Sequence, residues 1–144
     1  MLAIGCDHGG FELKNAVTEY LEKNNIEYVD MGCYDKNSVD YPDIAQAVCK
    51  KITDGECELG ILICGTGIGI SISANKIDGI RAALCHSEYD AKMTRAHNDA
   101  NVLCMGGRTT GVEIALAITE SFLKGKFEGG RHARRVEKIM ALEK

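Results

Sequence analysis

The chain alternates short apolar runs with amphipathic helical patterns along its whole length. The five apolar runs that predict strands cover residues 2–6, 26–31, 59–64, 80–85 and 100–104. Helical patterns follow them within residues 11–21, 44–52, 70–75, 87–96 and 111–124, and a further helix is expected over about 130–142. Such alternation is typical of parallel β-α units whose sheet is covered on both faces. The sequence therefore predicts one α/β domain, a Rossmann-like three-layer sandwich with a five-stranded parallel sheet and a C-terminal helix.

Composition excludes several classes of protein. The 144 residues suffice for one domain with its own core, and the net charge of −4 argues against a nucleic-acid surface. No apolar run approaches the ~18 residues of a membrane span, and the first residues lack the pattern of a signal peptide. The seven cysteines are odd in number and contain no C-x-x-C pair. We therefore expect a cytoplasmic protein with reduced, mostly buried thiols and no membrane or nucleic-acid partner.

Polar residues follow three of the predicted strands directly. Asp7 and His8 follow the first run, Cys64 ends the third, and residues 105–108, closing on Arg108, follow the fifth. Open parallel sheets bind ligands beyond the carboxyl ends of their strands, near the point where the strand order reverses. These residues are therefore expected at one edge of the sheet, where the fold would place a site.

The turn after the third strand is rich in glycine and leads into a helix expected to begin near Ser71. Glycines free the backbone to point successive N–H groups at one spot, next to a helix N-terminus with partial positive charge. The residues that would form this anion-binding loop are Gly65, Thr66, Gly67, Ile68 and Gly69. The thiol of Cys64 stands at the beginning of the loop, so an anionic ligand and a candidate base are expected together.

Other readings of this loop fail on spacing. The dinucleotide fingerprint needs a glycine where the chain has Ile70, and no Gly-Lys-Ser/Thr of a Walker loop is present. A phosphatase loop would need an arginine six residues past its cysteine, and neither Cys6 nor Cys64 has one. The four histidines show no pairing at ligand spacing. We therefore expect no cofactor and no metal.

The last helical segment carries basic residues at its start. Arg131 and Arg135 are four residues apart, so they project from one face of the helix. Guanidinium groups there suit a bidentate phosphate contact, and the alternative is a solvated basic helix end. Cations in a first helical turn oppose the helix dipole, which favours the phosphate. An apolar stripe through Val136, Ile139 and Met140 predicts docking on the domain or on a second subunit.

Motifs along nearly the entire chain carry a family resemblance. They occupy residues 6–8, 40–42, 63–69, 74–76, 95–101 and 129–132, together with Arg135. They resemble those of type B ribose-5-phosphate isomerases, a family that includes galactose-6-phosphate isomerase subunits and enzymes acting on allose phosphate. The resemblance implies reversible conversion of ribose 5-phosphate and ribulose 5-phosphate through a cis-enediolate, without a metal or cofactor.

The resemblance also implies a role for each site residue. Cys64 would move the carbon-bound proton, since a helix N-terminus favours the thiolate, while Thr66 would pass a proton between O1 and O2. His97 would open the sugar ring, because histidine titrates near neutral pH. Backbone N–H groups of residues 65–69 would hold the oxyanion. The remaining expected substrate ligands are Asp7 and Asn98 for sugar oxygens, and His8, Arg108, Arg131 and Arg135 for the phosphate.

Members of the family are dimers or tetramers with active sites across the subunit contact. We therefore expect a homodimer, or a homotetramer, in which the helix near 130–142 presents its arginines to the partner's glycine loop. One alternative is an isomerase of another sugar phosphate, such as allose 6-phosphate or galactose 6-phosphate. A second alternative is a non-catalytic sugar-phosphate sensor. The sensor is disfavoured because a sensor needs no base, whereas Cys64 and His97 are both present.

Overall fold

A five-stranded parallel sheet forms the centre of the computed structural model, which describes residues 1–144. The strands are β1 (Leu2–Cys6), β2 (Tyr28–Asp30), β3 (Leu59–Cys64), β4 (Ala82–Leu84) and β5 (Val102–Gly106). Their order across the sheet is β2-β1-β3-β5-β4. Cys64 at the end of β3 pairs with Gly106, and Cys6 at the end of β1 pairs with Ile63. The carboxyl ends of the three central strands therefore finish level with one another.

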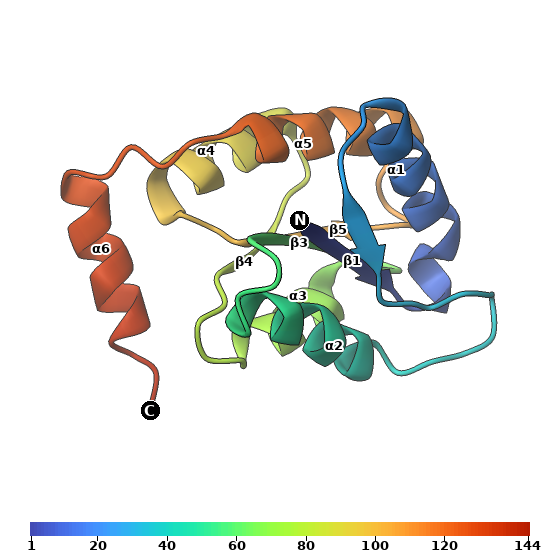
Figure 1. Ribbon diagram of the computed structural model, residues 1–144, viewed down its shortest axis with the longest axis horizontal. Helices are drawn as coiled ribbons and strands as arrows, with labels where there is room; N and C mark the ends of the chain where they lie inside the picture. The colour runs from blue at the N-terminus through green and yellow to red at the C-terminus, as the bar shows by residue number, and fades with distance from the viewer.

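Helices cover both faces of the sheet (Figure 1). One layer contains α1 (Phe11–Lys23), α4 (Glu88–Asn98) and α5 (Val112–Lys124), and the other contains α2 (Tyr41–Thr53) and α3 (Ile68–Asn75). A single 3-10 turn, η1 (His8–Gly10), joins β1 to α1. The predicted three-layer α/β sandwich with a five-stranded parallel sheet is confirmed. No helix is both long enough and apolar enough to cross a bilayer.

The two faces of the sheet bury separate cores. Ile4, Ile63 and Met105 point into the core beneath α1 and α5, whereas Leu62 and Cys104 point into the core beneath α2 and α3. Alternate residues of a strand face opposite sides, so strands covered on both sides are apolar throughout. All seven cysteines are buried, and none is in a disulfide.

The last helix, α6 (Arg131–Met140), stands at the side of the molecule against α4 (Figure 1). None of its residues is buried. Its C-terminal end is held by an Arg81 guanidinium N–H to the Met140 sulfur at 3.4 Å and by the Gly79 N–H to the Glu143 carboxylate at 2.7 Å. Packing of this helix on a partner subunit stays a prediction.

Two of the boundaries that differ from the sequence expectation bear on the site, whereas β2 and β4 are only shorter than expected. Helix α3 begins at Ile68 and not near Ser71, because Gly67 takes a left-handed conformation (φ 80°) and caps the helix directly. Strand β5 continues to Gly106, so Met105 and Gly106 belong to the strand and not to the loop beyond it. The glycine loop and the end of β5 lie against each other, since a side chain at Gly106 would lie 2.7 Å from the Thr66 backbone.

Candidate active site

The strand order reverses between β1 and β3, and the loops after these strands touch. A side chain at Gly9 would meet the Gly65 nitrogen at 3.0 Å, which shows how closely the two loops approach. Asp7 lies between them, only 6% exposed, and its carboxylate accepts the Gly9 N–H at 2.9 Å. The structure therefore places Asp7 at the crevice where parallel sheets bind ligands.

Cys64 ends β3 at the base of the glycine loop. Its side chain is 4% exposed, and its sulfur accepts the Gly67 N–H at 3.1 Å. The left-handed conformation of Gly67 turns this N–H back toward the sulfur and starts α3 at the next residue. A donated N–H and a helix N-terminus both stabilise negative charge, so this position suits a thiolate.

The first turn of α3 offers unused donors beside Cys64. The Thr66 hydroxyl accepts the Ile68 N–H at 3.2 Å, and the first intrahelical bond runs from the Ser71 N–H to the Gly67 carbonyl. The N–H groups of Gly69 and Ile70 have no protein acceptor. They remain free for an anion, as in other anion-binding helix N-termini.

Arg108 and His8 complete this edge of the sheet. The Arg108 N–H donates to the Gly65 carbonyl at 2.9 Å, and its guanidinium lies 3.2 Å from where a Gly65 side chain would begin. His8 Nδ1 accepts the Val39 N–H at 3.3 Å, which leaves Nε2 for a ligand. We call the group formed by Asp7, His8, residues 64–69 and Arg108 the cradle edge.

His97 and Asn98 lie away from the cradle edge of their own chain. They end α4, which follows β4 and returns to the amino end of β5 at Val102. The five residues of β5 separate the two ends of the sheet by about 13 Å. One chain therefore does not bring His97 or Asn98 next to Cys64.

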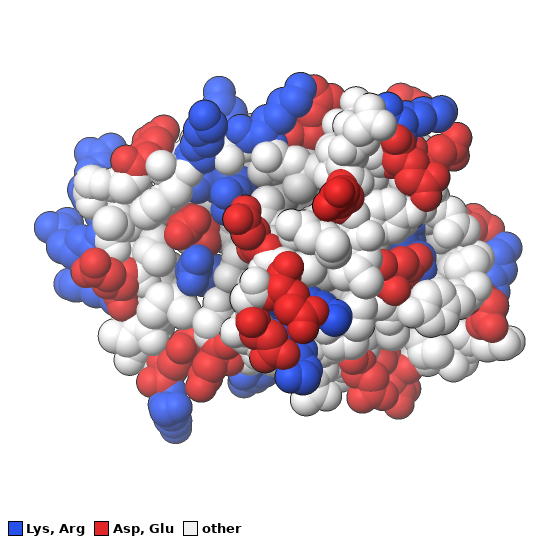
Figure 2. Space-filling view, in the orientation of Figure 1, with Lys and Arg blue, Asp and Glu red and all other residues white.

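Arg131 and Arg135 lie with His97 and not with the cradle edge, because α6 packs against α4. Basic side chains gather at the left of Figure 2, where Figure 1 places α6. We call the group formed by residues 97–98 and 128–135 the α4–α6 corner. The predicted site residues thus form two separate groups, one at each end of the sheet.

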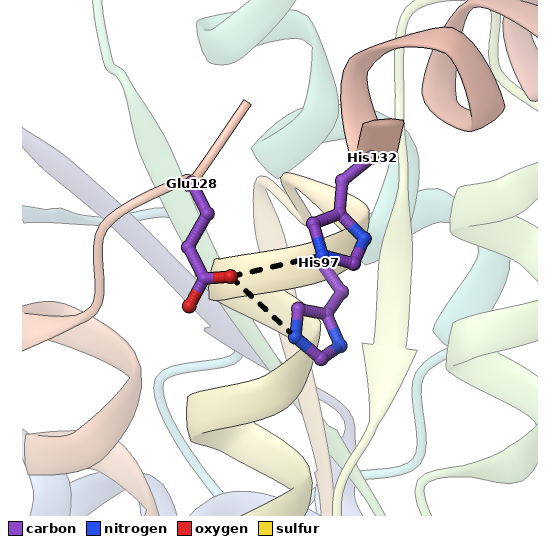
Figure 3. Close-up of side chains that lie close together, drawn as sticks. All are labelled: His97, Glu128 and His132. Atoms are coloured by element: carbon purple, nitrogen blue, oxygen red, sulfur yellow. Dashed lines mark ion pairs between the residues drawn. The ribbon is translucent and has the colours of Figure 1, made fainter. Parts of the chain in front are cut away.

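Two further residues join His97 at the α4–α6 corner (Figure 3). The rings of His97 and His132 stack with centroids 4.1 Å apart and planes 10° from parallel. Their Nε2 atoms lie 3.8 and 3.7 Å from the same Glu128 Oε1. Desolvation, followed by the charges of His97 and Arg131, lowers the pKa of His132, so its ring is neutral at neutral pH.

Neither His132 nor Glu128 is among the site residues expected from the sequence. The i,i+4 spacing of Glu128 and His132 was the one available signal, since a turn brings such residues together. Their approach to His97 depends on the fold. The Glu128 N–H donates to the Ala96 carbonyl at 3.0 Å, which joins the start of α6 to the end of α4.

Comparison with known proteins shows similarity to sugar-phosphate isomerases along nearly the whole chain. The chain is 47% identical to ribose-5-phosphate isomerase B of Escherichia coli over 99% of this chain and 95% of the relative. It is 44% identical to D-erythrulose-4-phosphate isomerase of Pectobacterium atrosepticum over 96% of this chain and 91% of the relative. A solved structure of Clostridium thermocellum ribose-5-phosphate isomerase B superposes with a TM-score of 0.96 at 50% identity, covering 98% of this chain and 95% of that one.

The family comparison covers the same length of chain. The ribose/galactose isomerase family matches residues 2–139, which include the whole sheet, both groups of site residues and nearly all of α6. Together with the full-length relatives, this match shows that the chain belongs to the ribose/galactose isomerase family.

Proposed function

We propose that this protein interconverts ribose 5-phosphate and ribulose 5-phosphate by proton transfer at Cys64. The observation that carries the proposal is the buried Cys64 sulfur, which accepts the Gly67 N–H at 3.1 Å beside the free N–H groups of α3. A base and an oxyanion site are thus held together in the crevice beside Asp7. Full-length similarity to ribose-5-phosphate isomerase B supports this substrate.

The chemistry follows from what each group can do. Cys64 as a thiolate takes the proton from C2 of the open-chain aldose, and the negative charge moves to O1 of the cis-enediolate. The N–H groups of the first turn of α3 stabilise that charge, a contribution of about 3–4 kcal/mol for a well-placed donor. The Thr66 hydroxyl passes a proton between O1 and O2, and Cys64 returns its proton to C1. Substrate and product are isomers, so the cycle needs no electron acceptor.

The separation of the two groups within one chain supports a site shared between two subunits. In this arrangement the α4–α6 corner of one chain faces the cradle edge of its partner. His97 then opens the sugar ring, Asn98 binds sugar oxygens, and the arginines of α6 bind the phosphate with the partner's His8 and Arg108. Holding the phosphate fixes the reacting carbon against Cys64.

Exposed apolar side chains beside the glycine loop support the same assembly. Ile68 and Ile72 of α3 are 50% and 57% exposed, and Tyr41 packs over Gly69 next to them. Helix α3 carries no charged residue and no distinct polar face, which is typical of a helix covered on both faces. We infer a homodimer that covers α3 and brings α6 to the partner. The reduced thiols are consistent with work in the cytoplasm.

The test measures interconversion of the two pentose phosphates in the presence of a chelator. We expect turnover by the wild type and a fall in kcat of about 10²–10⁴-fold in Cys64→Ala. Cys49→Ala removes another buried thiol and is the matched control, with activity unchanged. Full activity of Cys64→Ala would refute the role of this thiol. Faster turnover of a tetrose or hexose phosphate would move the proposal to another substrate of the family.

A further inference from the structure

Three side chains of the α4–α6 corner place metal-binding atoms close together, with a ring nitrogen of His97 and of His132 facing the Glu128 carboxylate (Figure 3). The ring nitrogens of His97 and His132 and a carboxylate oxygen of Glu128 all lie within 4.8 Å of one another. A tetrahedral zinc ion with bonds of about 2.0–2.1 Å holds its ligand atoms about 3.4 Å apart. The two distances to Glu128, 3.8 and 3.7 Å, are already near that value.

The backbone holds these ligands in place, while their side chains can still adjust. Glu128 is tied to Ala96, the residue before His97, and the side chain of His132 is only 12% exposed. The side chains of His97 and Glu128 are 40% and 59% exposed, and no hydrogen bond holds either one. Rotation of His97 out of the stack would bring its in-plane lone pair toward the point that His132 and Glu128 face.

The charge state of the cluster selects the kind of ion. Each histidine binds a metal through the lone pair of an unprotonated ring nitrogen, and Glu128 supplies one negative charge. Arg131 and Arg135 lie close to the cluster. Their positive charges disfavour a cation that is bound by electrostatic attraction alone. Two imidazoles and one carboxylate favour zinc or copper over magnesium or calcium, which prefer oxygen ligands.

We propose that His97, Glu128 and His132 form a binding site for a zinc-type divalent ion that inhibits the enzyme. The ion occupies the ring nitrogen through which His97 exchanges protons with the sugar. Two histidines and one glutamate leave a fourth position for water. The inhibition rests on the proposed function, whereas binding of the ion does not.

Binding is tested on the chelator-treated, full-length protein with zinc and a chromophoric zinc indicator as competitor. We expect one zinc per chain, with affinity reduced at least about tenfold in Glu128→Gln and in His132→Asn. The matched controls Glu137→Gln and His86→Asn change exposed residues outside the cluster and should bind as the wild type does. Equal affinity in all five proteins would overturn the site. A cobalt complex with sulfur-to-metal absorption would also overturn it, by assigning the ion to a thiol.

Inhibition is measured separately on the same proteins. We expect zinc to inhibit the wild type, and Glu128→Gln to require at least about tenfold more zinc for half-inhibition, each measured against the same protein's activity without zinc. Magnesium should not inhibit either protein. If zinc binds as expected but the wild type has no isomerase activity, the site stands and the proposed function fails. If zinc binds at this cluster and activity is unaffected, the inhibitory role is wrong.

Discussion

The cradle edge and the α4–α6 corner differ in how firmly their own chain holds them. At the cradle edge, Asp7 and Cys64 are almost fully buried, and each accepts a backbone N–H from its own loop. At the α4–α6 corner, α6 has no buried residue, and the His97 side chain has only its stacking on His132 and its 3.8 Å approach to Glu128. The first region is complete within one chain. The second exposes the side chains proposed to bind substrate, which is expected of a surface that a partner covers.

This difference suggests that the two regions contribute differently to the site. Backbone donors cost no reorganisation when charge develops, so the cradle edge suits the proton transfer itself. Long side chains on an exposed helix suit capture of a phosphate and release of product. The following predictions test whether the two regions meet across a subunit contact and whether they differ in rigidity.

The largest expected effect is complementation between two inactive variants. Cys64→Ala damages only the cradle edge, and His97→Asn damages only the α4–α6 corner. In a mixed dimer with shared sites, one site carries both changes and the other carries neither. Co-expression in equal amounts should therefore restore about one quarter of wild-type activity, because half of the dimers are mixed and each has one intact site. The measurement is the isomerase rate of the co-purified mixture.

Two controls make the complementation result decisive. Each variant expressed alone fixes the background rate. A mixture of Cys64→Ala with Thr66→Val should gain no activity above the two separate backgrounds. Both residues belong to the cradle edge, so every site in a mixed dimer carries one of the two changes. If the Cys64→Ala and His97→Asn mixture also stays at background, the two regions do not share a site.

The next effect is on substrate binding by α6. We expect Arg131→Ala and Arg135→Ala each to raise KM about 10–100-fold, because a hydrogen bond to a charged group contributes about 1.5–3 kcal/mol. Stability should change little, since both residues are exposed on a helix with no buried residue. Arg134→Ala removes the same charge from a position turned about 100° around the helix from Arg135, so it is the matched control and should leave KM unchanged. Steady-state kinetics with both pentose phosphates check this, and an equal effect of all three would point to net charge instead.

The sequence predicts the cradle edge far better than the α4–α6 corner, and the cause is physical. Cys64 and the glycines are neighbours in the chain, so strand, turn and helix rules place them together without knowledge of the rest. His97 and His132 meet only because α6 returns to α4, a contact no local pattern encodes. The start of α3 was expected near Ser71 because glycines at 67 and 69 obscured the helix, whereas Gly67 is its cap.

Two glycines compare the rigidity of the two regions. Gly67 and Gly129 both have positive φ, at 80° and 68°. A side chain at Gly67 would lie 2.8 Å from the Met105 backbone, whereas nothing lies within 4 Å at Gly129. Gly129→Ala should lower the free energy of unfolding by about 1–2 kcal/mol from left-handed strain alone. Gly67→Ala should lower the free energy of unfolding by about 1–3 kcal/mol more than Gly129→Ala does, because of the clash with the Met105 backbone. Denaturant unfolding at one protein concentration checks this. Equal losses of unfolding free energy in the two variants would mean that the cradle edge is no more rigid than the α4–α6 corner.

The smallest expected effect is the pH dependence of stability caused by His132. Its folded pKa is lowered by desolvation and by the charges of His97, Arg131 and Arg135, against the attraction of Glu128. The unfolded chain then binds more protons below about pH 6.5, the ordinary histidine value. Stability should therefore fall as the pH drops from about 6.5 toward the lowered pKa, and be unaffected by this group at higher pH.

Replacing His132 isolates that contribution. His132→Asn should show a smaller loss of unfolding free energy than the wild type between pH 7.5 and 5.5, while exposed His86→Asn should follow the wild type. Denaturant unfolding at each pH gives the difference. If the unfolding free energy falls equally with pH in all three proteins, the His132 ring is not desolvated in the folded assembly. In that case the α4–α6 corner would be solvated even when a partner subunit is present, which would argue against a shared, water-excluding site.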